Sequence, residues 1–249
     1  MPSPDPRWTT VLLDADGTLF PSEEPAFAAS AGVVNQVLAS LGLPAAYDGE
    51  ELRRAASGRN FRGLVPDLLA PAGRRLPDEE LDRWVAREAE VVTDHLRDVL
   101  LPDARVRSEL ERIGRSLRLA LVSSSALTRL GTCLEVTGLA GLLPPERRFS
   151  AQDSLPTPTS KPDPAVYRLA LARLGLVAEE AVAVEDAVSG VRSAVAAGIA
   201  VVGITTFVPE QERAVRAADL RAAGASAVVE GWEELADQLL LARTQRRTA

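Results

Sequence analysis

Cysteine, aromatic residues and long apolar runs are scarce in this chain. The one cysteine, Cys133, has no partner for an internal disulfide, and it cannot supply a thiolate metal cluster by itself. No apolar stretch approaches the ~20 residues that are needed to span a bilayer, and the opening MPSPDPRW lacks the basic and apolar regions of a secretory signal. We therefore expect a cytoplasmic protein that does not enter a membrane.

The charge balance argues against one class of partner. The net charge is −7 at pH 7, so the chain as a whole does not attract nucleic acid or anionic lipid. A local pocket of cations and backbone N–H groups can still bind a small anionic substrate. With 249 residues, of which 46% are hydrophobic, the chain can build one large domain or a core with a smaller insert.

Short apolar runs alternate with amphipathic segments through most of the chain. The runs predict strands at Thr10–Leu13, Leu117–Val122, Ala181–Val184, Ile199–Ile204 and Ser226–Val229. Helices are predicted at residues 104–114, 127–136, 164–174 and 188–197, and a polar loop at residues 150–161. Strands that alternate with helices imply right-handed crossovers. The predicted fold class is therefore α/β, with a parallel sheet covered on both faces.

One long stretch does not follow this alternation. From about Ala26 to Leu100 the apolar residues recur at spacings of three and four, which is typical of amphipathic helices. Glycines and prolines are expected to divide the stretch into several helices, namely Gly42, Gly58, Pro66, Pro71, Gly73 and Pro77. We interpret residues 21–100 as an all-α cap domain, inserted into a core of residues 1–20 and 101–249.

Acidic and hydroxyl residues follow the predicted strands where each strand ends, and Lys161 lies in a loop just before a helix. In an open α/β sheet, ligands bind outside the carboxyl ends of the strands. We therefore expect these side chains to converge at one edge of the sheet. They are Asp14, Asp16, Ser123, Ser124, Ser125, Lys161, Glu185 and Asp186.

This set of residues suits phosphoryl transfer. Carboxylates with open water positions suit Mg²⁺, which joins phosphate oxygens, and a carboxylate can attack phosphorus to form an aspartyl phosphate. A spacing of two points Asp14 and Asp16 to the same side, so that one attacks while the other delivers a proton to the leaving oxygen. Lys161 and Mg²⁺ would neutralise the transferred group, and Ser123 and Ser124 would hold its oxygens.

Four segments resemble the motifs of the haloacid dehalogenase-like (HAD) superfamily. They are DADGTL at 14–19, LALVS ending at Ser123, SKPDPAVY around Lys161, and VEDAVSGVRSAVAAG at 184–198. The resemblance implies a Rossmann-like core, with Asp14 as the nucleophile and Asp16 as the general acid and base. It also implies that Asp14, the Asp16 carbonyl and Asp186 bind Mg²⁺, assisted by Glu185.

The helical insert resembles the mobile α-helical cap of the subfamily that contains phosphoglycolate phosphatase, small sugar-phosphate phosphatases and β-phosphoglucomutase. Many relatives have an acidic residue two places after the leucine of DGTL, where this chain has Pro21 at the hinge into the cap. The segment SGRNFR at 57–62 resembles the substrate-specificity loop of the family. Arg59, Asn60 and Arg62 are therefore candidates to contact the leaving group of a small phosphorylated metabolite.

The motifs leave more than one activity open. A phosphatase would release phosphate from Asp14 to water, whereas a β-phosphoglucomutase-like mutase would return it to another hydroxyl of the sugar. A dehalogenase fits less well, because that branch typically lacks the aspartate that corresponds to Asp16. The intact motifs also argue against a non-catalytic binding protein. We expect a magnesium-dependent phosphatase, acting as a monomer or homodimer.

Three further residues are given structural interpretations. Ser125 is expected to belong to a polar turn, and Cys133 to be packed in the core. The one histidine, His95, is expected to be an exposed helical residue rather than part of a Ser-His-Asp triad.

Overall fold

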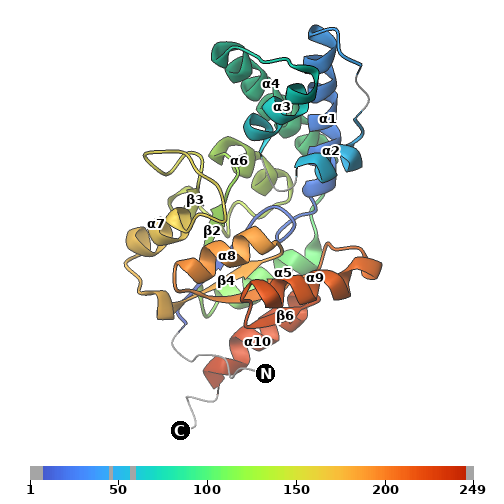
Figure 1. Ribbon diagram of the computed structural model, residues 1–249. Helices are drawn as coiled ribbons and strands as arrows, with labels where there is room; N and C mark the ends of the chain where they lie inside the picture. Colours follow the sequence, from blue (N-terminus) through green and yellow to red (C-terminus); the bar gives the residue numbers. More distant parts are fainter. Residues whose placement is uncertain (1–7, 45–46, 57–59, 245–249) are drawn as a thin grey trace. The chain divides into compact units, whose positions relative to one another are not determined.

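The computed structural model describes residues 8–44, 47–56 and 60–244. The chain divides into two compact units. One consists of Met1–Phe20 with Leu101–Ala249, and we call it the α/β unit; the other is Pro21–Leu100, the helical unit. Figure 1 shows both along the course of the chain.

The α/β unit contains a six-stranded sheet in the order β3-β2-β1-β4-β5-β6. The strands are β1 (Thr10–Leu13), β2 (Arg118–Ser123), β3 (Arg148–Ser150), β4 (Ala181–Glu185), β5 (Ala200–Ile204) and β6 (Ala227–Val229). Every neighbouring pair is parallel. The predicted fold class, an α/β protein with a Rossmann-like parallel sheet, is confirmed.

Strand β1 lies between β2 and β4, and its end determines where Asp14 lies along the sheet. Leu13 pairs with Leu121 on one side and with Val184 on the other. The next residue, Asp14, is therefore level with the ends of both neighbours. The chain leaves β1 toward β2 on one side and later returns to β4 on the other. Such a reversal of strand order is where open α/β sheets bind ligands.

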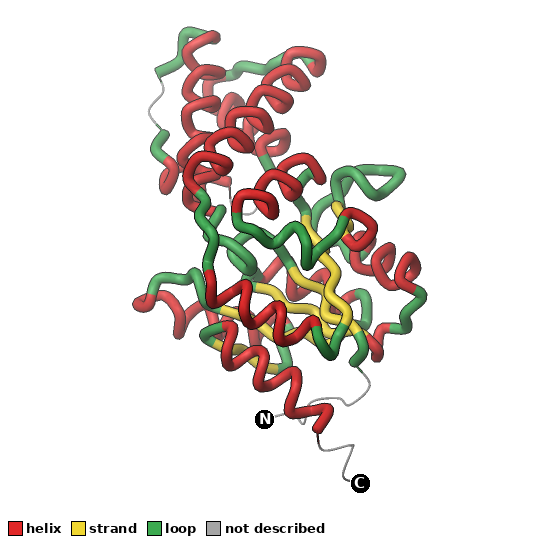
Figure 2. Tube along the Cα trace, turned by 180° about the vertical axis from the view of Figure 1, so that it is seen from behind, coloured by secondary structure: helices red, strands yellow, loops and turns green. Residues whose placement is uncertain are grey.

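Helices cover both faces of this sheet. They are α5 (Ala104–Gly114), α6 (Leu127–Val136), α7 (Ala165–Leu174), α8 (Val188–Ala196), α9 (Glu210–Ala223) and α10 (Trp232–Thr244), with short 3-10 turns η2 (Pro145–Arg147) and η3 (Ala178–Glu180). Residues of α7 and α8 share a buried core with Leu12, Ala120 and Val122. Helices α5 and α10 pack together on the other face, which Figure 2 shows from behind.

The boundaries of the predicted elements agree closely with the structure, but strand β3 and helices α9 and α10 were not predicted. Helices α5 and α6 have the predicted bounds, and α7 begins one residue later than expected. Strand β3 lies at the edge of the sheet, immediately before and partly within the predicted polar loop, and it pairs with β2. Its three residues are too few to show a hydrophobic period, so only pairing identifies it as a strand.

The helical unit is built around its own buried core. Its elements are α1 (Glu23–Ser40), α2 (Gly49–Ala56), α3 (Phe61–Leu69), the 3-10 turn η1 (Ala70–Ala72) and α4 (Asp78–Val99). Helix α1 packs against α2 and α4, and the core includes Val33, Leu52, Leu64 and Leu69. The prediction that Pro66 separates two helices is wrong. Pro66 lies inside α3 on an exposed face.

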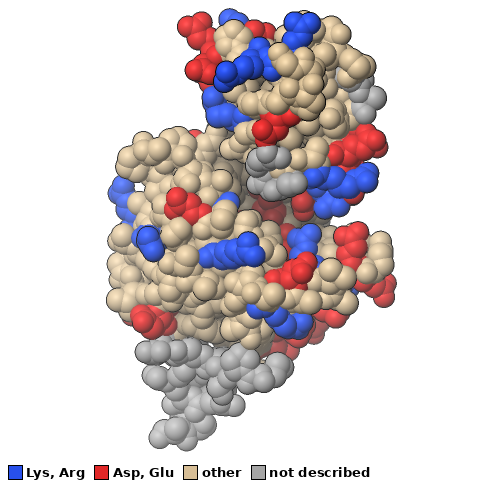
Figure 3. All heavy atoms as spheres, viewed as in Figure 1, with Lys and Arg blue, Asp and Glu red and all other residues tan. Residues whose placement is uncertain are grey.

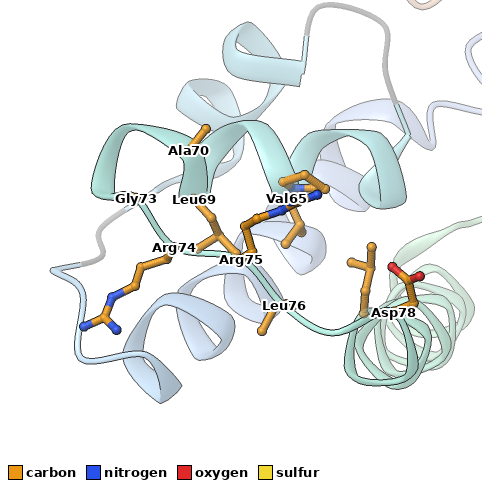
Figure 4. A pocket seen from close by; sticks show the side chains of 10 residues that line it. Val65, Leu69, Ala70, Gly73, Arg74, Arg75, Leu76 and Asp78 are labelled. Atoms are coloured by element: carbon orange, nitrogen blue, oxygen red, sulfur yellow. The ribbon is translucent and has the colours of Figure 1, made fainter.

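A hollow of about 360 Å³ opens on the helical unit between the end of α3 and the start of α4 (Figure 4). It is lined by Val65, Pro66, Leu69, Ala70, Gly73, Arg74, Arg75, Leu76, Asp78 and Leu81. Asn60 and Arg62, which the sequence nominates for substrate contact, are not part of its lining.

The surface matches the modest net charge of the chain. On the described part of the face drawn in Figure 3, acidic and basic side chains are interspersed. Among the described helices, none combines the length and the apolar character that a membrane crossing requires.

Candidate active site

Lys161 joins two of the predicted acidic residues at the carboxyl ends of β1 and β4. Its Nζ lies 2.5 Å from Asp14 Oδ1 and 2.6 Å from Glu185 Oε1, and it donates to the carbonyl oxygen of Val122 at 2.8 Å. All of these side chains are buried. The lysine therefore spans the ends of β1, β2 and β4, although it comes from a loop.

The charges of this cluster are mutually dependent. Burial raises the pKa of Asp14 above its usual value, although Lys161 opposes part of the rise. Burial likewise raises the pKa of Glu185 to about 7, again against the attraction of Lys161. For Lys161 itself, burial disfavours the ammonium, but the Asp14 and Glu185 carboxylates outweigh that effect and raise its pKa. The site thus keeps a cation between two acids at neutral pH.

Asp186 is held beside this cluster by two other segments of the chain. Thr18 donates from Oγ1 to Asp186 Oδ1 at 3.2 Å, and Arg216 of α9 donates to the Asp186 carbonyl at 3.0 Å. Gly17 has a φ of +77°, and a Cβ there would lie 2.2 Å from Asp186 Oδ2. Both the backbone conformation and the close approach therefore require glycine at position 17.

The donor set fits a hard divalent cation. Asp14, Glu185 and Asp186 are buried, and each offers one carboxylate oxygen within 4.8 Å of the others. Mg²⁺ prefers oxygen ligands and is usually held by one or two carboxylates, with water and phosphate completing its shell. Three buried acids at this spacing could supply such ligands.

The serines after β2 form a hydrogen-bonded turn at the same edge. Ser123 Oγ accepts from the Ser125 backbone N–H at 3.0 Å, and Ser124 Oγ accepts from the Lys161 backbone N–H at 3.0 Å. A hydroxyl that accepts a bond still has its own hydrogen to donate. Ser123 and Ser124 can therefore donate to the oxygens of an anion at this edge.

The Asp16 carboxylate contacts Ser125 of the turn after β2 and Arg129, which the sequence did not nominate. Its Oδ2 accepts from Ser125 Oγ at 2.6 Å, and its Oδ1 accepts from Arg129 of α6 at 2.8 Å. Ser125 lies in the turn after β2, as expected, and its hydroxyl also contacts Asp16. Cys133 is buried, as expected. Burial raises the pKa of its thiol to about 12, so it is not a nucleophile at neutral pH.

Glu185 is wedged between Lys161, Tyr167 and the backbone of α8. The Tyr167 hydroxyl of α7 donates to Glu185 Oε1, the same oxygen that Lys161 contacts. A Cβ at Gly190 would lie 1.8 Å from Glu185 Oε2. The carboxylate therefore has no room to retreat if position 190 gains a side chain.

Gly190→Ala tests the close packing of Glu185 against α8. The added methyl group should displace the Glu185 carboxylate from Lys161, lowering the free energy of unfolding by about 1–3 kcal/mol, the usual cost of overpacking. Turnover should also fall, because Lys161 loses one of its two acidic partners. Thermal unfolding and any measurable turnover would report the two effects.

Gly131→Ala on α6 is the matched control. There the nearest atom to an added Cβ is Arg148 Nη1 at 3.8 Å, an ordinary contact, so this helix-interior change should stabilise by about 0.5–1 kcal/mol or leave stability unchanged. If Gly190→Ala behaved like Gly131→Ala, the close packing against Glu185 would be contradicted.

The predicted substrate residues of the helical unit have partners within that unit. Asn60 caps α3, because its Oδ1 accepts from the Gly63 backbone N–H at 3.0 Å, and Arg62 forms an exposed ion pair with Asp82. Arg59 lies outside the described residues. Their contact with a leaving group stays a prediction. His95 is half-buried on α4 rather than exposed.

The residues of the cluster were predicted from the sequence, but their partners Thr18, Arg129, Tyr167 and Arg216 were not. Three of these had a usable signal, and Thr18 belongs to the DADGTL motif. Arg129 lies in the first turn of a helix that starts at the predicted edge of the sheet, and Tyr167 belongs to the same motif as Lys161. Arg216 had no such signal, because α9 was not predicted.

Comparison with known proteins gives related sequences and folds. A family model described as haloacid dehalogenase-like hydrolase matches residues 8–198. The phosphorylated carbohydrates phosphatase of Thermotoga maritima is 32% identical over 197 residues, which cover 76% of this chain and 81% of that protein. Protein CbbY of Cereibacter sphaeroides is 29% identical over 204 residues, with 76% and 80% covered.

A solved structure shares both sequence and fold with the chain. It is a HAD family hydrolase of Deinococcus radiodurans R1, crystallised with bound phosphate and sodium. The two superpose with a TM-score of 0.67 at 27% identity, covering 96% of this chain and 97% of the other.

Proposed function

Because the chain belongs to the haloacid dehalogenase-like hydrolase family, we propose that it is a magnesium-dependent phosphatase that hydrolyses a small phosphate monoester through a phosphorylated Asp14. One observation carries the proposal: Lys161 Nζ lies 2.5 Å from Asp14 Oδ1, inside a buried cluster with Glu185 and Asp186. A buried nucleophilic carboxylate beside a fixed cation suits attack on an anionic phosphoryl group.

In the first step an oxygen of Asp14 attacks phosphorus, and the bond from phosphorus to the ester oxygen breaks. Asp16 gives a proton to that leaving oxygen, so an alcohol departs. Lys161 neutralises charge on the transferred group, while the hydroxyls of Ser123 and Ser124 donate to its oxygens.

In the second step water attacks the phosphorus of phospho-Asp14. Asp16, now a carboxylate, takes the proton from that water, and the bond from phosphorus to the Asp14 oxygen breaks. Inorganic phosphate leaves and both aspartates return to their starting states.

The proposed metal site would use residues at this edge. Asp14, Asp186 and the Asp16 carbonyl would hold Mg²⁺, with Glu185 assisting from its position beside Lys161. When bound, the ion supplies positive charge that offsets the carboxylate cluster and the phosphoryl oxygens.

Phosphorylated sugars are the favoured substrate class. One relative is named as a phosphatase of phosphorylated carbohydrates and is 32% identical to this chain. The helical unit would act as the cap that selects the leaving group. Its candidate contacts with the leaving group are Arg59, Asn60 and Arg62. Phosphoglycolate-like esters belong to the same class of small anionic monoesters.

Phosphate release over a panel of sugar phosphates, phosphoglycolate and nucleotides tests the proposal. At least one sugar phosphate or phosphoglycolate should be hydrolysed, and EDTA should reduce the rate to background because the acidic cluster then lacks its cation. Added Mg²⁺ should restore it. Malachite-green detection would measure the phosphate released with and without chelator.

Two outcomes would contradict the proposal. Unchanged turnover in EDTA would show that the reaction does not require a metal ion. Conversion of one sugar phosphate to its isomer without phosphate release, primed by a bisphosphate, would identify a mutase. A mutase would still use Asp14, so the panel must measure both phosphate and sugar isomers.

A further inference from the structure

Each oxygen of the Asp16 carboxylate accepts a hydrogen bond from another side chain. Arg129 Nη2 lies 2.8 Å from Oδ1, and Ser125 Oγ lies 2.6 Å from Oδ2. The side chains of Arg129 and Asp16 are only 23% and 26% exposed, so water and salt screen this pair less than a surface pair. Two donors on two different oxygens restrict both torsions of the aspartate side chain.

Both donors come from well-anchored parts of the α/β unit. Arg129 projects from α6, whose Leu130, Cys133 and Leu134 are buried in the unit. Ser125 is held at its backbone on both sides, because its N–H donates to Ser123 Oγ at 3.0 Å and its carbonyl accepts from Ser150 Oγ at 2.8 Å. The two donors to Asp16 therefore have fixed positions relative to the end of β2.

The two donors differ in what they allow at each oxygen. A guanidinium has donors only, so the oxygen that faces Arg129 serves as an acceptor whether Asp16 is neutral or ionised. A serine hydroxyl can rotate to donate or accept. Oδ2, beside Ser125, is thus the oxygen of Asp16 that can carry a proton without losing its partner.

We propose that Arg129, with Ser125, is a positioning residue for Asp16, which orients the carboxyl group so that Oδ2 delivers the proton to the leaving oxygen. This inference rests on the proposed function, because only an acid–base role gives the orientation of Asp16 a chemical consequence. The proton moves from Oδ2 to the ester oxygen as the phosphorus–oxygen bond breaks, and Arg129 itself neither gains nor loses one.

The test compares two esters that differ in their need for a proton. An alkyl phosphate from the panel, either a sugar phosphate or phosphoglycolate, has a poor leaving group that must be protonated, whereas 4-nitrophenolate leaves well without one. General acid catalysis contributes about 10²–10⁴-fold. Arg129→Met should therefore lower kcat/KM for the alkyl phosphate by about 30–100-fold, and for 4-nitrophenyl phosphate by less than about 3-fold. kcat/KM is used because it reports the step in which the leaving group departs.

Conservative and matched variants sharpen the result. Arg129→Lys should recover part of the loss because it restores a cationic donor, and Ser125→Ala should show the same selectivity with a smaller effect. Arg107→Met is the control for the loss of an arginine ion pair outside the site, because Arg107 forms an exposed pair with Glu111 on α5 at 2.9 Å. It should leave the ratio between the two esters unchanged.

Asp16→Asn and Asp14→Asn separate this inference from the function on which it rests. Asp16→Asn should show the full discrimination between the esters, and Asp14→Asn should abolish turnover of both. If Asp16→Asn discriminates but Arg129→Met lowers both esters equally, or neither, the positioning role is overturned and the phosphatase stands. If Asp14→Asn hydrolyses both esters normally, the proposed function fails.

Discussion

Asp14→Asn should lower kcat for phosphate release by about 10⁴-fold or more, the range seen when a catalytic nucleophile is removed. The asparagine side chain has nearly the same shape, and its oxygen can still accept from Lys161 Nζ, which lies 2.5 Å from Asp14 Oδ1. It lacks the negative charge and the second carboxylate oxygen that attack requires. The fold should persist while the chemistry is lost.

Two measurements accompany the rate. Beryllium trifluoride, which mimics an aspartyl phosphate, should inhibit the unchanged protein and fail to bind the variant. Thermal unfolding should show no loss of stability, because burial already disfavours the charged form of Asp14. His95→Ala on α4 is the control and should keep full activity. Turnover by Asp14→Asn above a few per cent of the original would exclude the covalent step at this residue.

Lys161→Met should damage both stability and activity. Methionine has a similar length but no charge, so Asp14 and Glu185 would face each other without the cation that now lies within 2.6 Å of both. Removal of one partner from a buried ion pair typically costs about 3–5 kcal/mol. The loss of a positive charge beside the transferred phosphoryl group should lower kcat by about 10²–10³-fold.

A double variant separates the two contributions. Lys161→Met combined with Glu185→Gln removes a carboxylate that has lost its cation, so much of the stability should return while activity stays low. Chemical denaturation and phosphate release would be measured on the same preparations. If the double variant regained activity together with stability, Lys161 would have a structural role only, and its contact with phosphate would be refuted.

Much of the fold could be predicted because the signals are local. The strand β1 is four buried residues in a run, as expected for a strand covered on both faces of a parallel sheet. Helices α5 and α6 were bounded correctly by their periodicity and termini. Strand β3 could not be predicted, because three residues contain too little pattern and only their pairing with β2 makes them a strand.

The acids of the site were predictable because they follow strands directly. Once a parallel sheet was inferred, Asp14 and Glu185 had to lie at the same edge, level with one another. The contacts of Asp16 were not predictable in this way. Arg129 is 113 residues away in the chain, and its direction depends on how α6 is rotated against the sheet. Periodicity places residues on a helix face but does not say which atom that face will meet.

The amino-acid sequence by itself determined the sheet, the order of its motifs and the identity of the acids, serines and lysine that meet at its edge. These follow from patterns within a few residues, together with the geometry common to parallel sheets. Only the tertiary structure decided which oxygen of each acid faces which donor. Examples are the two hydrogen bonds to Asp16 and the packing of Tyr167 and Gly190 around Glu185. Such contacts depend on close packing at the scale of single atoms, and that packing exists only after distant segments have come together.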